Sequence, residues 1–243
     1  MPEPKTFTET FRVFDFECDI NRKLLPGGAL RISQQISTDH CDCLGLTADF
    51  YRANHAVFLL AKLACEFTRV PLIGETLTLV TLPETAKRAV YKRVTRILDE
   101  EGREIGLVDS RWVLVDTDTH RILRRPPEAF AALPFDEEVP FALNMEIPKP
   151  ESTEPAGTAR ADYTLCDTNR HLNNTHYADV ACNALPLEEL ERRAVRRIAL
   201  NYHSEVPAGE SFELERGRLD ENTWYVAGQR GGKRCFEAKL TLE

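Results

Sequence analysis

The sequence lacks any hydrophobic run long enough to cross a membrane. The first residues, Met1 to Thr6, have no apolar core, so we predict no secretory signal peptide. The formal net charge of −8 argues against broad binding of nucleic acid, which requires a basic surface. These absences predict a cytoplasmic protein that has neither a membrane nor a nucleic acid as its partner.

Several common catalytic and metal-binding patterns are also absent. There is no G-x-S-x-G sequence and no glycine-rich loop with phosphate-binding spacing, which disfavours an ordinary serine hydrolase. The seven cysteines form no C-x-x-C pair, and Cys41 and Cys43 are too close together for the usual zinc spacing. His171 and His176 are poorly placed to share one helical face. We therefore expect reduced thiols, no metal ion and no cofactor.

The chain does contain many short segments with strand-like or helix-like hydrophobic patterns. Its 243 residues suffice for one large domain or two small ones. Alternating or fully apolar segments predict strands at 7–16, 57–70, 76–82, 89–98, 105–115, 158–165, 195–206, 211–219, 223–229 and 234–242. Helical spacing or a leading proline predicts helices at 27–51, 126–132, 171–185 and 187–193.

A segment with a different composition divides the chain. Residues 134–157 contain five prolines and several acidic residues but no hydrophobic period, which predicts an extended linker. We therefore expect an N-terminal domain over 1–133 and a C-terminal domain over 158–243.

The two parts resemble each other in sequence. Residues 18–23 (C-D-I-N-R-K) match 166–171 (C-D-T-N-R-H), and 69–75 match 205–210 with one residue dropped. The two matches occur in the same order, which indicates an internal duplication. Each half is then one helix followed by an antiparallel sheet that can cover it.

The richest group of polar residues lies in the second half. Asp167, Asn169 and His171 alternate where a strand is expected to lead into a helix, and the unpaired N–H groups of a first helical turn could hold a polarised carbonyl. A simpler interpretation is that Asp167 or Asn169 only caps the helix. Glu205 adds a second carboxylate to the group. In the first half, Lys23 and Arg69 stand in place of His171 and Glu205, so we expect that half to be degenerate.

Other candidates are weaker. His203 lies two residues before Glu205 on a predicted strand, so the two side chains could face the same side. Cys166 and Cys182 lie beside apolar or small residues, and we favour inert packing for both. Arg192, Arg193, Arg196 and Arg197 follow the polar group and could receive an acidic partner.

The D-x-N-x-H-x-N-N sequence at 167–174 resembles the active-site motif of acyl-acyl carrier protein (acyl-ACP) thioesterases. Residues 200–205 look like the strand of that family that carries a catalytic glutamate, and the likeness continues in the first half from Phe11 to 112–115. Plant members place a cysteine directly after this glutamate, whereas this chain has Val206, which excludes a cysteine nucleophile there. No plastid transit peptide precedes the first strand, so we expect a bacterial relative.

The resemblance implies an α+β fold with two hotdog domains in tandem, in which each half is a long helix wrapped by an antiparallel sheet. It also implies that Asp167, Asn169, His171 and Glu205 are the catalytic residues. The implied reaction is hydrolysis of a fatty acyl thioester on acyl carrier protein, which ends fatty acid synthesis, by a monomer or homodimer. Two alternatives remain: a hotdog thioesterase that acts on acyl-CoA, and a lipid-binding hotdog protein without catalysis.

Overall fold

The structure, a computed structural model, describes residues 5–243. Residues 1–4, where we predicted that no signal peptide is present and that the N-terminal domain begins, lie outside the described residues.

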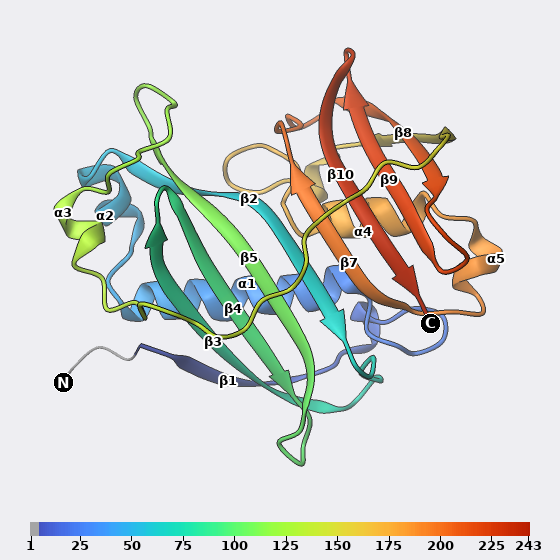
Figure 1. Cartoon of the computed structure of the whole chain (residues 1–243), viewed down its shortest axis with the longest axis horizontal. Coiled ribbons are helices and arrows are strands. Elements are labelled where there is room, and N and C mark those ends of the chain that lie inside the picture. Colours follow the sequence, from blue (N-terminus) through green and yellow to red (C-terminus); the bar gives the residue numbers. More distant parts are fainter. Residues whose placement is uncertain (1–4) are drawn as a thin grey trace.

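A single ten-stranded antiparallel sheet organises the molecule (Figure 1). The first half contributes β1 (Phe7–Arg12), β2 (Ala56–Phe67), β3 (Thr76–Lys87), β4 (Val90–Leu98) and β5 (Glu104–Asp116). The second half contributes β6 (Glu154–Arg160), β7 (Val195–Tyr202), β8 (Ser211–Arg218), β9 (Thr223–Arg230) and β10 (Lys233–Leu242). The spatial order is β1-β3-β4-β5-β2-β7-β10-β9-β8-β6, so the second half repeats the first in reverse order about the β2–β7 pair.

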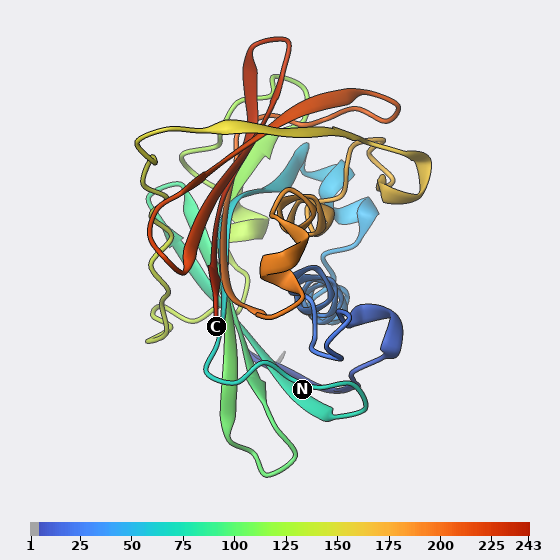
Figure 2. The same ribbon diagram turned by 90° about the vertical axis from the view of Figure 1, so that its right-hand side faces the viewer.

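The two main helices, α1 (Pro26–Cys43) and α4 (His176–Asn183), lie on one face of this sheet (Figure 2). The shorter helices are η1 (Asp15–Glu17), α2 (Ala48–Ala53) and α3 (Glu128–Ala131) in the first half, and η2 (Tyr163–Leu165) and α5 (Leu187–Leu190) in the second. In each half the order is one strand, one main helix and then four strands. This order agrees with the predicted duplication.

The β2–β7 pair joins the two halves into one body. Ala64 lies opposite Ala199 and Leu63 opposite Leu200 across this antiparallel pair. Helices α1 and α4 contact each other, and one hydrophobic core includes side chains from both halves. The interior is therefore shared between the halves.

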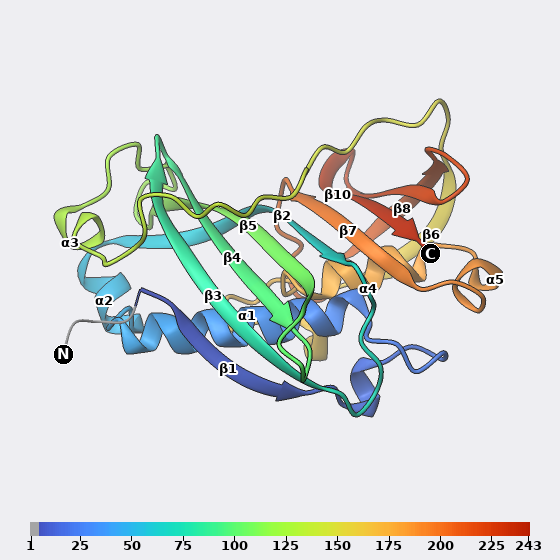
Figure 3. The same cartoon turned by 60° about the horizontal axis from the view of Figure 1, so that its bottom comes forward.

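The predicted linker crosses the sheet face opposite the helices (Figures 2 and 3). Met145 is only 8% exposed and packs on Ala64 and Ala199, directly over the β2–β7 pair. The backbone N–H of Leu143 donates to the Asp109 carboxylate at 2.9 Å, and that of Val139 donates to Glu84 at 2.8 Å. These contacts hold the linker in the extended form that its prolines predict.

Several predicted boundaries are wrong. The helix expected at 27–51 is two helices, α1 and α2. The helix expected at 171–185 is shorter and begins at His176, because the residues before it form a hairpin and a capping turn. The strand expected at 158–165 lies at Glu154–Arg160, inside the predicted linker at its start, and η2 follows it. The strand expected to reach residue 206 ends at Tyr202.

Among residues 5–243, no helix combines the length and the apolar character needed to span a bilayer.

Met145 should be a major contributor to the stability of the sheet. We expect Met145→Ala to lower the free energy of unfolding by about 2 kcal/mol, because it empties a buried contact over two alanines. Leu187→Ala is a matched control on a side chain that is 62% exposed, and it should change stability by less than about 0.5 kcal/mol. Urea denaturation measures both values. Equal, small effects would show that the linker only lies against the sheet without stabilising it.

Candidate active site

A tight hairpin carries three of the four predicted site residues. Cys166 pairs with Leu172 across this hairpin, and the N–H of Asp167 donates to the carbonyl of His171 at 3.0 Å. Arg170 turns the chain with a left-handed φ of 64°. The Asp167 carboxylate accepts a hydrogen bond from the N–H of Asn169 at 2.8 Å, so it orders the loop from within.

A second segment packs against this hairpin and brings Glu205 to it. The N–H of Leu172 donates to the carbonyl of Val206 at 2.9 Å, and His171 pairs with Pro207. As a result, Nδ1 of His171 lies 3.1 Å from a carboxylate oxygen of Glu205. A carboxylate at this distance can hold the imidazole in one orientation and select its tautomer.

Asp167 and Asn169 share the hairpin with His171 but make separate contacts. Within residues 5–243, neither of their side chains is hydrogen-bonded to the side chain of His171 or Glu205. Asp167 is partly exposed and Asn169 is exposed. The expected position in the first turn of a helix is wrong, because α4 begins at His176 with Thr175 as its N-cap, and Asn173 orders the turn before it. The side chain of Asn173 accepts hydrogen bonds from the N–H and the hydroxyl of Thr175, at 2.9 and 2.8 Å.

His203 is not part of this group. It follows the end of β7, so the expected strand geometry that would align it with Glu205 is wrong. Its Nε2 lies 3.0 Å from Glu237, whose carboxylate also accepts a hydrogen bond from the Tyr225 hydroxyl at 2.7 Å and pairs with Lys149 of the linker. Although burial of Glu237 opposes ionisation, the hydrogen bonds from Lys149, Tyr225 and His203 lower its pKa to about 2. This cluster anchors the segment that leads to Glu205.

The first half contains the same hairpin without its histidine. Cys18 pairs with Leu24, Arg22 has the same left-handed φ of 64°, and Asp19 accepts hydrogen bonds from two backbone N–H groups. Lys23 replaces the imidazole and lies 3.4 Å from Glu243. Asn21 donates to the carbonyl of Leu190 at 3.1 Å. The polar groups of this hairpin are therefore used in structural contacts.

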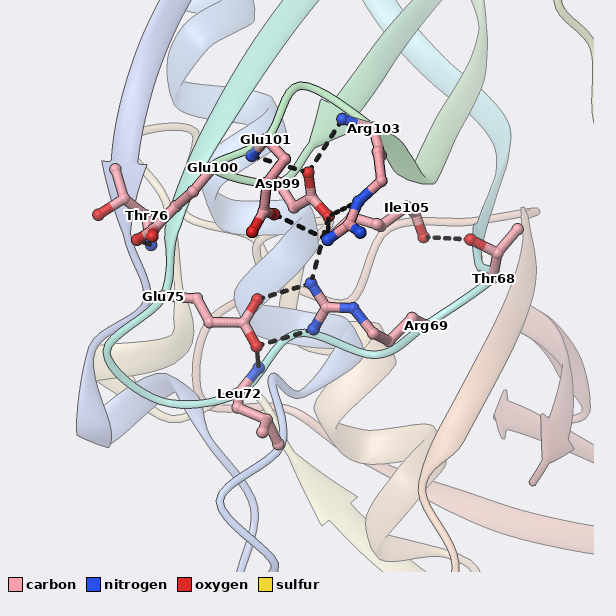
Figure 4. A network of polar contacts seen from close by, with 10 residues as sticks. All are labelled: Thr68, Arg69, Leu72, Glu75, Thr76, Asp99, Glu100, Glu101, Arg103 and Ile105. Carbon is pink, nitrogen blue, oxygen red and sulfur yellow. Dashed lines mark hydrogen bonds and ion pairs between the residues drawn. The ribbon is translucent and has the colours of Figure 1, made fainter.

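Arg69 is also held by neighbouring carboxylates (Figure 4). Its guanidinium forms a two-pronged ion pair with Glu75 at 2.7 and 2.9 Å and lies 3.9 Å from Asp99. The hydrogen bonds from Arg69 lower the pKa of Glu75, even though burial opposes this change. Because these carboxylates hold the guanidinium of Arg69, we do not expect it to bind a ligand beside Lys23.

The backbone register corrects one correspondence between the halves. Lys23 pairs with Leu72, as His171 does with Pro207. Counting back from these pairs, Glu205 corresponds to Val70 and not to Arg69. The alignment of the two short sequences was one residue out at this point, because it introduced a gap to match their Val-Pro pairs. The backbone hydrogen bonds run without a gap, since Ile73 and Ala208 donate to the equivalent Arg22 and Arg170. The first half still lacks both the imidazole and the second carboxylate.

Two neighbouring cavities lie between the segment that follows the hairpin of the second half and the elements of the first half. The smaller, of about 30 Å³, is lined by Asn174 and Thr175, which follow the hairpin, and by residues of α1, β2 and β5. The larger, of about 260 Å³, lies between α1, α2 and strands β2 to β5. Both are lined by Gln34, Ser37 and Trp112, so they are neighbours. Sequence analysis did not locate them, because their lining residues come from several distant elements.

The thiols near the hairpin are poorly suited to nucleophilic attack. Desolvation raises the pKa of the Cys166 thiol, and burial raises that of Cys182 to about 12. All seven cysteines are free thiols, as predicted. Of the four arginines considered for docking, Arg193 donates to Asn222 and to Glu189, and Arg197 pairs with Glu66. These two arginines therefore hold parts of the fold together.

Comparison with known proteins places this chain in a family. Residues 4–133 match the model of the acyl-ACP thioesterase N-terminal domain, and residues 156–231 match the model of the acyl-ACP thioesterase C-terminal domain. The chain belongs to the acyl-ACP thioesterase family. It is 23% identical over 226 residues to the chloroplastic oleoyl-acyl carrier protein thioesterase 2 of Arabidopsis thaliana. The match covers 84% of this chain and 61% of the plant protein. The chain thus spans about three fifths of that relative.

Solved structures of similar proteins have the same fold. The acyl-ACP thioesterase from Bacteroides thetaiotaomicron matches with a TM-score of 0.87 and 23% identity, and the match covers 98% of both chains. The 12:0-ACP thioesterase from Umbellularia californica matches with a TM-score of 0.82 and 16% identity, covering 99% of this chain and 98% of the other. The predicted α+β fold, a tandem double hotdog, is confirmed, although the second helix is shorter than expected.

The Glu237 cluster predicts a specific acid dependence of stability. The pKa of Glu237 is about 2 in the folded state, against 4.5 as its ordinary value. Between these values the unfolded chain binds a proton that the folded chain does not, so the stabilisation is present above pH 4.5 and is lost as the pH falls toward 2.

Glu237→Gln should therefore be less stable than the wild type at neutral pH and should lose less stability on acidification across this range. Urea denaturation at a series of pH values measures the difference between the two proteins. Parallel curves for the wild type and the variant would contradict the lowered pKa.

Proposed function

We propose that this protein hydrolyses fatty acyl thioesters carried on acyl carrier protein and so releases free fatty acid, the step that terminates fatty acid synthesis. The observation that carries the proposal is the contact between His171 of the hairpin and Glu205 of the segment packed against it. Asn174 and Thr175, which follow the hairpin, line a cavity together with residues of the first half. Membership of the acyl-ACP thioesterase family supports the same reaction.

We assign the catalytic roles to Asp167, Asn169, His171 and Glu205. The exposed carboxamide of Asn169 donates a hydrogen bond to the thioester carbonyl and stabilises the developing oxyanion. Because Glu205 faces Nδ1 of His171, the neutral ring donates there and presents Nε2 as the proton acceptor. When water is the nucleophile, His171 takes its proton and the water oxygen adds to the carbonyl carbon. The carbon–sulfur bond then breaks, and the proton on His171 passes to the leaving thiolate.

Asp167 fits either of two roles. It can act as the base for water, or it can attack the carbonyl itself to form a mixed anhydride that water then opens. In either role one oxygen of its carboxylate stays bound to the N–H of Asn169, which keeps the other oxygen oriented. Val206 is fully buried behind Glu205, so no nucleophile stands at that position.

The division of work between the halves follows from the cavities. The acyl chain would enter beside Asn174, pass Trp112 and lie between α1 and the first sheet. In this scheme residues 1–133 form a binding half with a degenerate polar site, residues 134–157 form the linker, and residues 158–243 form the catalytic half. The predicted tunnel between helix and sheet thus lies in the half that lacks the catalytic residues.

The partner and the setting complete the proposal. Exposed Arg192, beyond the α5 helix, remains a candidate to receive the acidic carrier protein. The free thiols support a cytoplasmic location, where disulfides are rare. Two fused halves already form the paired arrangement, which supports a monomer or a simple homodimer.

Matched substitutions in the two hairpins test the catalytic assignment. Asp167→Asn should lower kcat by about a hundredfold or more, as expected for loss of a nucleophile or general base. Asp19→Asn changes the equivalent residue of the first half and should retain most activity. Both replacements are nearly isosteric, and melting temperatures check the fold. A comparable loss of kcat from Asp19→Asn in a folded protein would mean that both halves contribute to the chemistry.

The nature of the thiol carrier needs a separate measurement. The two substrates carry the same acyl group, one on acyl carrier protein and the other on coenzyme A. We expect kcat/KM to be higher by about tenfold or more for the substrate on acyl carrier protein, because only that substrate gains contacts outside the cavity. Equal values would favour the acyl-CoA alternative. No turnover of either substrate, with the fatty acid still bound, would favour a lipid-binding protein without catalysis.

A further inference from the structure

The larger cavity has an unusual feature for a site that holds a hydrocarbon chain. Most of its wall is apolar, with side chains such as Val57, Phe58, Trp112 and Phe135. One lining residue is Arg93 of β4, which is only 8% exposed. Arg93 lines the larger cavity and not the smaller one, whose lining includes Asn174 and Thr175.

The partners of Arg93 are neutral. Its guanidinium donates to Thr81 at 3.1 Å and to the sulfur of Cys41 at 3.5 Å, and it lies 3.1 Å from Nδ1 of His40. Within residues 5–243, no carboxylate forms an ion pair with it. Burial lowers the pKa of Arg93, and the nearby thiol of Cys41 and phenol of Tyr51 offset only part of this change.

Neighbouring arginines of the same sheet show the contrast. Arg96, three residues further along β4, pairs with Glu104 at 2.5 Å, and Arg111 of β5 pairs with the buried Asp109. Arg93 is the most deeply buried of these three arginines, and it is the one that has no carboxylate partner among the described residues. A buried charge without an opposite charge is strongly unfavourable unless something in the site supplies one.

We infer that the part of the cavity around Arg93 binds a carboxylate carried on the acyl chain, so that the preferred substrate is the half-thioester of a dicarboxylic acid. The inference rests on the proposed function to the extent that the cavity holds the acyl group. The ligand carboxylate supplies the negative charge that Arg93 lacks. Its oxygens accept charge-assisted hydrogen bonds from the N–H groups of the guanidinium. The apolar wall then holds the methylene groups between the two ends of the ligand.

Tyr51 lies on the same wall, and burial raises the pKa of its hydroxyl. This hydroxyl is hydrogen-bonded to Cys41, which also accepts a hydrogen bond from Arg93. The guanidinium is therefore the charged donor at this place.

A purely structural role does not account for the charge. Arg93 does connect α1, through His40 and Cys41, to Thr81 of β3. Neutral donors could make these contacts at a lower cost of desolvation, and Thr95 already reaches Thr81 at 3.3 Å from the same strand. The positive charge is useful only if an anion arrives in the cavity.

The main experiment compares two series of acyl thioesters on the same carrier. One series ends in a methyl group and the other in a carboxylate, and both cover a range of chain lengths. In the wild type, we compare the two series at the chain length whose far end reaches Arg93. There the carboxylate-ended chain should have a kcat/KM higher than that of the methyl-ended chain by about tenfold or more, which is the scale of one charged hydrogen bond. A preference for the methyl-ended chain at every length would overturn the inference, and this result requires no variant.

Variants then assign the preference to one residue. Arg93→Met should remove the preference or reverse it, and Arg93→Lys should keep part of it because it keeps the charge. Arg96→Met is the matched control, since it removes an arginine of the same strand that is already paired with Glu104. It should leave the ratio of the two kcat/KM values unchanged. An unchanged ratio in a folded Arg93→Met protein would reduce Arg93 to a brace between α1 and the sheet.

A binding measurement separates this inference from the proposed function. Calorimetry with the monomethyl ester of a dicarboxylic acid and with the methyl ester of the corresponding fatty acid requires no hydrolysis. Tighter binding of the first, lost in Arg93→Met, would support the carboxylate site even if no thioester is turned over. Hydrolysis of thioesters without any such difference in binding would leave the proposed function intact and overturn the carboxylate site. Tight binding of an ester that ends in a hydroxyl group, with no tight binding of the carboxylate-ended ester, would also overturn the carboxylate site.

Discussion

The pairing of β2 with β7 is the interaction on which the rest of the structure depends. It turns two five-stranded sheets into one, and its centre, Ala64 opposite Ala199, is small enough for Met145 of the linker to pack closely over it. Because the sheet is continuous, α1 and α4 lie side by side on its other face and share one hydrophobic core. The same pairing brings Asn174 and Thr175 of the second half against Leu60 and Trp112 of the first. A cavity in one half can therefore open beside the polar hairpin of the other.

The two hairpins share their backbone and most of their side chains, and they differ chiefly in that Lys23 of the first half stands where the second half has His171. Both hairpins have the same cross-strand pair, the same left-handed arginine and a carboxylate that accepts the N–H two residues later. In the second half the imidazole meets a carboxylate that no arginine neutralises within residues 5–243. In the first half the amide of Asn21 is used to hold Leu190, and Lys23 is paired with Glu243. Similar backbones thus support a polar site in one half and contacts between the halves in the other.

Sequence patterns predicted the elements well where hydrophobic period alone decides the structure. The strands from β3 to β5 and from β8 to β10 are rich in apolar residues and bounded by turn residues, and they lie where expected within a few residues. Predictions were wrong where local hydrogen bonds compete with periodicity. Leu172 has helical spacing from Tyr177 and later residues, but its backbone pairs with Cys166 and Val206, and Asn173 orders the following turn. Such contacts join distant residues, and no local pattern records them.

By itself, the sequence determined the duplication, the two-half architecture and the group of polar residues at 167–171 with Glu205, since residue types and spacing are local properties. Only the tertiary structure decided that Glu205 faces His171 while His203 turns to Glu237, and that Val70 rather than Arg69 matches Glu205. It alone also located the cavities in the first half and Arg93 in their wall. A cavity is bounded by side chains from many elements, and a charge is unpaired only with respect to its spatial neighbours, so neither property exists until the chain has folded.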